Sequence, residues 1–334
     1  IERKADGIGH FRPRAGVTVF QEVSPGLSHR HHEEAFDDFA LQPLLPRRLS
    51  QAGPGVAWFD LDGDGHEELI LGSGRGGTLT VFRADGAGGF ARLASEFSLP
   101  DDLTGLVGWI PAPGERVLLA GLAHYEAPTN SLAGLLAFKM QNGKLRMFPM
   151  PELAGLPPNV GPLAVADYDA DGDLDLFVGG RPPAGRYPTG AFSRLYRNEQ
   201  GRLVLDAANQ ALLEKVGLVN GAVFSDLTGD GWPELVLACE WGPVRVLKNQ
   251  AGTFSDATQE LGLAAHAGWW TGVETGDLNG DGLLDIVAAN WGLNSPYQPT
   301  PAHPVVMFYG DLDADSRPDL IEGYFAPELG KLVP

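Results

Sequence analysis

The chain has 334 residues, of which 45 are glycine and 26 are proline, and it shows no long helical periodicity. This length can bury a large core, and the composition is typical of an all-β protein with many turns. The formal net charge of −19 argues against nucleic acid and anionic membranes as partners. No run of 18 apolar residues occurs, so the sequence predicts no transmembrane segment. Cys239 is the single cysteine, which excludes an intramolecular disulfide.

Residues 1–50 form the first predicted segment and precede a set of repeats. The stretch GVTVFQEV at residues 16–23 alternates apolar and polar side chains, which predicts an extended strand that closes a sheet elsewhere in the fold. The chain begins at Ile1 without the pattern of a signal peptide. We therefore expect either a processed chain or part of a longer one.

The histidine-rich stretch SHRHHEE follows at residues 28–34. His29, His31 and His32 could bind zinc or copper, but imidazoles at this spacing converge only in a special turn, and no cysteine or fourth ligand is evident. A solvated loop is therefore the favoured interpretation. Arg47 and Arg48 are expected to make surface ion pairs.

The stretch DLDGDGHEE at residues 60–68 has three aspartates at alternate positions, a glycine at position 6 and an acid at position 9. Carboxylates at this density repel one another unless a cation lies among them. Calcium takes six to eight oxygen ligands, and the glycine permits a sharp turn that points the carbonyl of position 7 inward. An EF-hand is disfavoured because its twelfth position, which needs a bidentate glutamate, would be Leu71.

The same nine-residue pattern occurs five times, which argues against a chance acidic turn. We number these loops in chain order as loop 1 (residues 60–68), loop 2 (167–175), loop 3 (226–234), loop 4 (277–285) and loop 5 (311–319). Ligands are predicted at positions 1, 3, 5 and 9 and at position 7, which contributes its backbone carbonyl in the pattern described for loop 1. They are Asp60, Asp62, Asp64, His66 and Glu68; Asp167, Asp169, Asp171, Asp173 and Asp175; Asp226, Thr228, Asp230, Trp232 and Glu234; Asp277, Asn279, Asp281, Leu283 and Asp285; and Asp311, Asp313, Asp315, Arg317 and Asp319.

Each acidic loop lies between an extended stretch and a short apolar run, so it is predicted to join two antiparallel strands. Two further hairpins, starting at residues 195 and 246, turn at Asn-x-x-Gly and supply a third and a fourth strand. Loops 1 and 2 lie about twice as far apart as the next pairs of loops. This spacing predicts an intervening repeat with a degenerate loop at residues 105–122.

Six repeat units are thus visible, and they predict a β-propeller of four-stranded antiparallel blades over residues 51–334. A complete ring is expected to have seven blades, which at about 50 residues each need more chain than is present, so the propeller is predicted to be truncated at its C-terminus. Loops 4 and 5 lie too close together for a full blade. We therefore expect a shortened or rearranged unit between them.

The loops and their flanking strands resemble FG-GAP or VCBS repeats, the calcium-bearing blades that also occur in integrin α-subunit heads, over roughly residues 50–325. The stretch EVSPGLSHRHHEEAFDDFALQPLLPRRLSQAGPG, with GWW, AANWGLNS and VVMFYGDLDADSRPDLIEGYF further on, is similar to bacterial members of the cartilage-acidic-protein-like family. Members of that family join FG-GAP repeats to an ASPIC/UnbV domain. The resemblance implies a secreted or cell-surface propeller whose loops hold up to five structural Ca²⁺ ions.

Two loops depart from this pattern. Thr228 stands at position 3 of loop 3, where it offers an oxygen but less charge, and Ser316 replaces the glycine of loop 5, where a positive φ costs about 1 kcal/mol. These two sites are expected to bind calcium most weakly. Because calcium is millimolar outside cells, we expect an extracellular or cell-surface location, with the periplasm as an alternative.

Three functions remain open. The leading one is a binding or assembly module for a protein or glycan partner; the others are a carbohydrate-active lyase or hydrolase, and a structural subunit of a larger surface assembly. No catalytic residue can be named, because the sequence lacks nucleophile-elbow, zinc-protease and phosphate-loop motifs. Trp269 and Trp270 could stack on a sugar ring, although core packing between blades is the favoured interpretation.

Overall fold

The structure is a computed structural model that describes residue 27 and residues 29–334, except 85–88, 94–96, 127–133, 154–155, 158, 191 and 293. Helix in this part of the chain is confined to α1 (Asp38–Leu41), α2 (Gln210–Leu213) and the 3-10 turns η2 (Pro151–Leu153) and η3 (Leu263–Ala265). The other elements are antiparallel strands, which confirms the all-β prediction. No helix of the described residues is both long and apolar enough to cross a membrane.

The first three sheets have four strands each, hydrogen-bonded in chain order. The first contains β1 (Val56–Phe59), β2 (Glu68–Leu71), β3 (Thr80–Ala84) and β4 (Phe90–Leu93). The second contains β5 (Asp102–Trp109), β6 (Val117–Ala123), β7 (Leu135–Gln141) and β8 (Lys144–Phe148). The third contains β9 (Val160–Ala166), β10 (Asp175–Gly180), β11 (Arg194–Glu199) and β12 (Arg202–Leu205).

The later strands are arranged less regularly. A fourth set of four strands contains β13 (Leu218–Ser225), β14 (Glu234–Gly242), β15 (Arg245–Gln250) and β16 (Thr253–Asp256). It shares a six-stranded sheet with β17 (Gly268–Gly276) and β18 (Asp285–Asn290), because the end of β14 pairs with the start of β17. A last, three-stranded sheet contains β19 (Val306–Gly310), β20 (Asp319–Ala326) and β21 (Lys331–Val333).

All six predicted strand–turn–strand units are antiparallel pairs: β1–β2, β5–β6, β9–β10, β13–β14, β17–β18 and β19–β20. The predicted degenerate repeat is therefore confirmed as β5–β6. The short spacing between loops 4 and 5 also has an explanation. The unit that begins with β17 has two strands, and the chain then runs through residues 291–305 to β19 without a third and fourth strand among the described residues.

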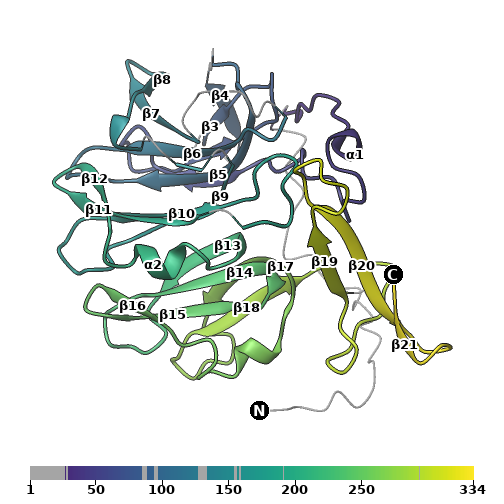
Figure 1. Cartoon of the computed structure of the whole chain (residues 1–334). Helices are drawn as coiled ribbons and strands as arrows, with labels where there is room; N and C mark the ends of the chain where they lie inside the picture. The colour runs from purple at the N-terminus through teal and green to yellow at the C-terminus, as the bar shows by residue number, and fades with distance from the viewer. Residues whose placement is uncertain are drawn as a thin grey trace, which may run out of the picture.

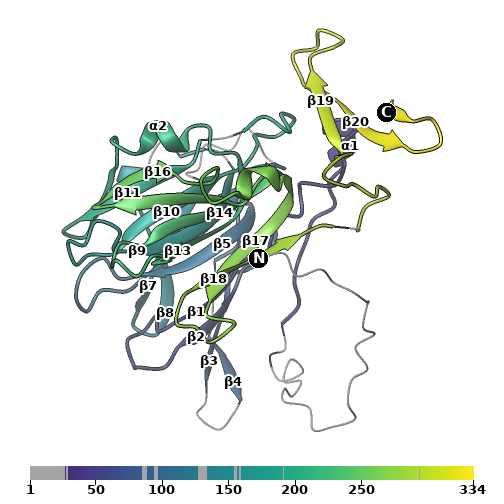
Figure 2. The same cartoon turned by 90° about the horizontal axis from the view of Figure 1, so that it is seen from below.

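The first strands of successive units pack against one another, β1 on β5, β5 on β9, β9 on β13 and β13 on β17. Glycine permits this approach: a Cβ atom at Gly221 of β13 would lie 2.9 Å from Cα of Gly272 in β17. A propeller predicts this packing order, while the number of blades and the closure of a ring stay predictions. Figures 1 and 2 show the sheets in succession, with β19–β21 standing to one side.

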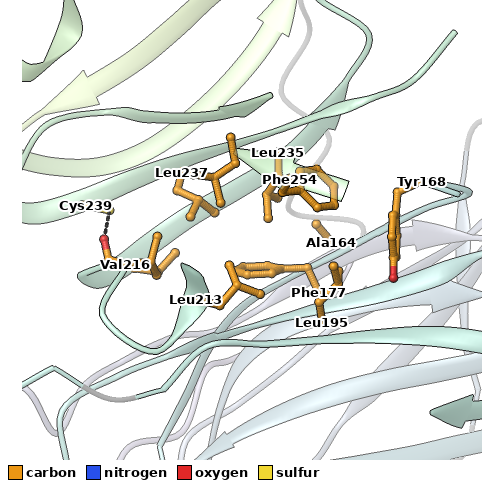
Figure 3. Packing of buried hydrophobic residues seen from close by; sticks show 12 residues of the cluster. Ala164, Tyr168, Phe177, Leu195, Leu213, Val216, Leu235, Leu237, Cys239 and Phe254 are labelled. Atoms are coloured by element: carbon orange, nitrogen blue, oxygen red, sulfur yellow. Dashed lines mark hydrogen bonds between the residues drawn. The ribbon is translucent and has the colours of Figure 1, made fainter. Parts of the chain in front are cut away.

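Apolar side chains fill the space between neighbouring sheets. In the largest cluster, Phe177 and Leu195 of the third sheet pack with Leu235 and Leu237 of β14 (Figure 3). Cys239 belongs to the same cluster; its thiol donates to the carbonyl of Val216 at 3.6 Å, and burial raises its pKa to about 12. The lone cysteine is therefore a core residue and not an exposed nucleophile.

The predicted Asn-x-x-Gly hairpins are confirmed as β11–β12 and β15–β16. In the first, Oδ1 of Asn198 accepts the backbone N–H of Gly201 at 2.8 Å, and both central residues of the turn have positive φ, +56° at Gln200 and +87° at Gly201. Glycine adopts this conformation without strain, which explains its place in the turn.

The described part of the N-terminal segment packs onto the sheets. Asp38 is fully buried, and its carboxylate accepts the backbone N–H groups of Leu49 and Ser50 at 2.7 and 2.8 Å. The side-chain amide of Gln42 donates to the carbonyls of Tyr187 and Pro318. The predicted closing strand at residues 16–23 lies outside the described residues.

Candidate functional site

All five acidic loops share one backbone geometry. The position-1 aspartate accepts the N–H of position 6 at 2.8–3.3 Å in every loop. The position-9 acid accepts the N–H of position 2 at 2.8–3.1 Å, and the position-5 aspartate accepts the N–H of position 7 at 2.8–3.0 Å. These bonds fold each loop around its own carboxylates.

The loops bring a defined subset of the predicted ligands together. In loops 1 and 2 the carboxylates of positions 1, 3 and 9 lie within 4.8 Å of one another, and in loop 5 those of positions 1, 3 and 5 do. Loops 3 and 4 form no such group of three, and they carry neutral Thr228 and Asn279 at position 3. The position-5 aspartates of loops 1 and 2 are outside these groups.

Several carboxylate oxygens in the loops are buried without a hydrogen-bond partner among the described residues. They are Oε1 of Glu68, Oδ1 of Asp169 and Oε1 of Glu234. A buried carboxylate oxygen without a partner is costly, and hard cations such as calcium prefer oxygen ligands of this kind. The donor set of the loops therefore fits a hard divalent cation.

Burial and neighbouring charge affect the protonation of these acids in the absence of metal. Burial raises the pKa of Asp175 to about 7, and burial followed by the charge of Asp171 raises the pKa of Asp169. In the exposed loop 4 the opposite holds, because the N–H of Gly282 lowers the pKa of Asp277.

Arginine side chains supply part of the positive charge in loop 1, which the sequence analysis did not foresee. Arg83 of β3 forms an ion pair with Asp62, and its Nε lies 3.6 Å from Oε1 of Glu68. Arg116 lies 3.3 Å from Oδ2 of Asp60. The signal was present in the sequence, because the third strands of four units carry a basic residue, Arg83, Lys139, Arg197 and Lys248. In the degenerate unit Lys139 pairs with Glu115 at 2.7 Å.

Two buried asparagines link one loop to the next, and sequence reasoning assigned them only to turns. The side-chain amide of Asn249 donates to the carbonyl of Tyr168 in loop 2 at 2.8 Å and to that of Pro233 in loop 3 at 3.1 Å. Asn198 makes the equivalent bond to Pro111 of the degenerate unit at 3.0 Å. These hydrogen bonds therefore link the loops of neighbouring units.

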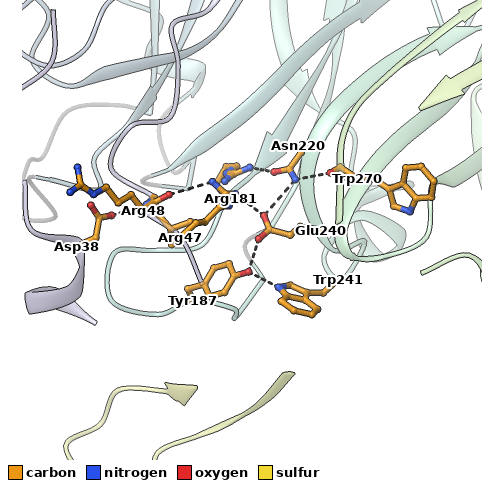
Figure 4. A network of polar contacts seen from close by, with 10 residues as sticks. Asp38, Arg47, Arg48, Arg181, Tyr187, Asn220, Glu240, Trp241 and Trp270 are labelled. Carbon is orange, nitrogen blue, oxygen red and sulfur yellow. Dashed lines mark hydrogen bonds and ion pairs between the residues drawn. The ribbon is translucent and has the colours of Figure 1, made fainter. Parts of the chain in front are cut away.

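A second polar assembly joins the third and fourth units to the N-terminal segment (Figure 4). Arg47 donates to Oε2 of Glu240 at 2.9 Å, and the side chain of Glu240 is only 1% exposed. The predicted ion pair of Arg47 is therefore present, but its partner is buried, so the prediction of a surface pair is wrong in its location. The N-terminal segment lies across the ends of the strands here and places Arg47 beside the buried carboxylate of Glu240.

The other oxygen of Glu240 accepts the hydroxyl of Tyr187 at 2.5 Å, and that hydroxyl accepts the indole N–H of Trp241 at 2.5 Å. Arg181 donates to Asn220, whose amide donates to the carbonyl of Trp270 at 2.7 Å. The neighbouring cavity beside Arg181 has a volume of about 20 Å³, enough for one water molecule. Among these residues, the buried Nε of Arg47 has no hydrogen-bond partner in the described part of the chain, and the other bonds of the network link the strand ends.

The three histidines have separate surroundings. The ring of His29 meets Phe82 edge-on, with centroids 6.4 Å apart, and burial lowers its pKa. His31 contacts Glu33 at 2.6 Å, while the backbone of His32 bonds to Ser73. Within the described part of the chain, the tight clusters able to hold an ion all lie in acidic loops. Zinc or copper binding by these histidines therefore gains no support.

Two acidic side chains beside this segment have raised pKa values. Burial raises the pKa of Asp102 to about 6 and that of Glu126 to about 7, with the charge of Glu33 among the further causes for both. Asp102 is 2% exposed, and Oδ1 accepts the N–H of Arg75 at 2.8 Å. Both acids therefore lie close enough to Glu33 of the N-terminal segment for its charge to favour their protonated forms.

The paired tryptophans at the start of β17 lie in different environments. Trp270 packs partly against the buried valines of β14 and β15, as core packing predicts. Trp269 instead stacks with Trp241 and Trp291, and both Trp269 and Trp270 line a surface groove.

The positive φ predicted for Ser316 at position 6 of loop 5 is confirmed at +68°.

The profile of the FG-GAP-like repeat matches residues 226–288. This segment contains loops 3 and 4, the strands β14 to β17 and the first part of β18. Residues 226–288 are an FG-GAP-like repeat. No curated protein matches the chain.

Two solved structures are among those that the chain matches. A candidate gluconolactonase has 17% sequence identity and a TM-score of 0.38, with 64% of this chain and 65% of that chain covered. Sqt1 from Saccharomyces cerevisiae has 10% identity and a TM-score of 0.43, with 80% of this chain and 69% of that chain covered. The chain thus spans about two thirds of either protein, and at these scores neither supports a functional argument.

Proposed function

We propose that the chain is a calcium-stabilised repeat domain of β-propeller type that acts as a binding or assembly module for a protein or glycan outside the cytoplasm. The observation that carries this proposal is the shared loop geometry. Three hydrogen bonds recur in all five loops, although the side chains at positions 3 and 7 differ. The narrower relationship to cartilage-acidic-protein-like chains is part of the same proposal.

Calcium in this proposal is structural. Its ligands come from tight turns between paired antiparallel strands, so an ion would hold two strands of one unit together and would not face a substrate. With Kd values of about 10⁻⁴ to 10⁻³ M and millimolar calcium, each occupied loop contributes about 0.4 to 1.4 kcal/mol, and five loops about 2 to 7 kcal/mol. This is comparable with the total stability of a domain.

The polar network at the strand ends favours a binding module over an enzyme. Its charged members, Arg47, Arg181 and Glu240, are bonded to protein groups, and the adjoining cavity holds about one water molecule. A carbohydrate-active centre needs an acid or a base that can reach a substrate, whereas both carboxylate oxygens of Glu240 in this network are bonded to protein groups.

The test is thermal unfolding of the chain in 1 mM calcium, in 1 mM magnesium and in excess chelator. We expect the melting temperature to be several degrees higher in calcium than in chelator, and magnesium to restore little of the difference because it demands a smaller, octahedral site. Calorimetric titration of the chelated protein should show binding at several sites. A melting temperature that is the same in chelator and calcium would refute the proposal.

A further inference from the structure

A groove of about 570 Å³ lies between the start of β17, the segment that follows β18, and β20. We call it the aromatic groove, because four of the seven tryptophans of the chain line it together with a tyrosine. These residues are Trp241, Trp269, Trp270, Trp291 and Tyr297. Ligand pockets usually have volumes of roughly 300 to 1,000 Å³, so the groove can hold a small ligand or a few units of a chain-like one.

Three of the indole rings form a row. The ring of Trp269 lies between those of Trp241 and Trp291, with centroid distances of 5.5 and 5.2 Å and interplanar angles of 31° and 23°. The guanidinium of Arg47 lies 5.4 Å from the ring centre of Trp269. The row is therefore held in place on several sides.

The same row is anchored to the buried network at the strand ends. The N–H of Trp241 donates to the Tyr187 hydroxyl at 2.5 Å, and that hydroxyl donates to Glu240. The backbone of Trp291 donates to the carbonyl of Trp269 at 2.9 Å. Aromatic groups that are ordered before binding lose little conformational entropy when a ligand arrives.

The lining of the groove is nearly free of charge, although the chain carries a net charge of −19. No lysine or arginine is among the described lining residues, and the one carboxylate, that of Glu322, accepts the hydroxyl of Tyr297 at 2.9 Å. The Arg47 guanidinium beside Trp269 is already paired with Glu240, so phosphate-bearing or carboxylate-bearing ligands would find no unpaired guanidinium or ammonium group beside the indole row. The groove is thus matched to a neutral ligand.

Polar side chains lie beside the rings. Asn290, Asn294 and Ser295 line the groove with amide and hydroxyl groups, which both donate and accept hydrogen bonds. The indole N–H of Trp269 is shielded from solvent and has no hydrogen-bond partner among the described residues. A ligand that suits this lining has an apolar face for the rings and neutral hydroxyl groups at its edge, which is the chemistry of a sugar ring.

We propose that the aromatic groove binds a neutral glycan, with a pyranose face against the indole row and sugar hydroxyls against the amide side chains. This inference rests on the proposed binding function and names the class of its ligand. A proline-rich peptide would also suit an aromatic groove, but it presents few donors to the amide side chains.

The test uses the full chain in 1 mM calcium with a panel of neutral hexose and N-acetylhexosamine oligosaccharides, uronic-acid oligosaccharides and a decaproline peptide. Binding is measured by calorimetry and by the change in tryptophan fluorescence. We expect a neutral oligosaccharide to bind best, and Trp291→Ala to weaken its binding at least about tenfold because a stacking surface is lost. The matched control is Trp58→Ala, which removes an indole on β1 that is 53% exposed and does not line the groove; the affinity of this variant should stay within twofold.

Calcium-dependent melting is recorded on the same three proteins, so that a failure to fold is distinguished from a failure to bind. Absence of neutral-glycan binding, equal affinity in the Trp291→Ala variant, or preference for decaproline or uronic acids would each overturn the inference. If calcium still raises the melting temperature in that case, the proposed calcium-stabilised module survives and only the assignment of the groove is wrong.

Discussion

Replacement of Asn249 by alanine tests whether the loops of neighbouring units are coupled. The Asn249 side chain is fully buried and makes three hydrogen bonds: to the carbonyls of Tyr168 and Pro233, and from the N–H of Gly252 at 2.9 Å. Each bond contributes about 1 kcal/mol net, and buried groups left without a partner cost about 1 to 3 kcal/mol. We expect the free energy of unfolding to fall by about 2 to 4 kcal/mol, a large share of the 5 to 15 kcal/mol typical of a domain.

The assay is urea unfolding followed by tryptophan fluorescence, in 1 mM calcium and in chelator. Gln250→Ala is the matched control, because Gln250 is the next residue on the same strand and is exposed; it should change stability by no more than about 0.5 kcal/mol. If Asn249→Ala costs less than about 1 kcal/mol, or no more than the control, then the asparagine does not connect the loops energetically.

Three further outcomes follow from the same structure. Asp169→Ala should lower calcium affinity in a calorimetric titration more than Thr228→Ala, because a carboxylate attracts the ion more strongly than a hydroxyl does; equal losses would contradict the ranking. Gly282→Ser gives loop 4 the residue that loop 5 has, at a φ of +84°, and should destabilise the protein by about 1 kcal/mol in urea unfolding; an unchanged midpoint would refute the strain argument. The pKa of Asp102 is raised from 3.8 to about 6, so the folded state binds more protons than the unfolded state between those values, and stability falls as pH rises through this window. Asp102→Asn should remove about 3 kcal/mol of that fall in folding stability. Parallel pH profiles of stability for the variant and the unmutated chain would contradict this prediction.

Local patterns in the sequence predicted the strand pairs and the loops between them. Aspartates at alternate positions fix the loop conformation through hydrogen bonds within nine residues, and Asn-x-x-Gly fixes its turn through residues three apart. Both features can therefore be predicted from a short stretch of sequence. The short spacing between loops 4 and 5 likewise indicated the reduced unit that begins with β17. Whether the loops bind calcium stays a prediction.

Contacts between distant segments could not be predicted in the same way. Arg47 reaches Glu240 across 193 positions, and Asn249 reaches Tyr168 across 81, so neither partner is marked by local spacing. The aromatic row is similar, because Trp241, Trp269 and Trp291 come from three separate strand ends. Only the packing of successive units brings these side chains together.

The two arginines beside loop 1 determine how this loop would respond to the loss of a divalent ion. Arg83 and Arg116 are covalently part of the chain, so they are counter-ions that cannot diffuse away when the concentration of divalent ions drops. If the loops bind calcium as proposed, loop 1 should keep more of its shape in a chelator than loop 4, whose acids form no ion pair with arginine or lysine among the described residues. The first sheet, onto which the N-terminal segment docks through His32, would then depend least on the ion for the shape of its loop.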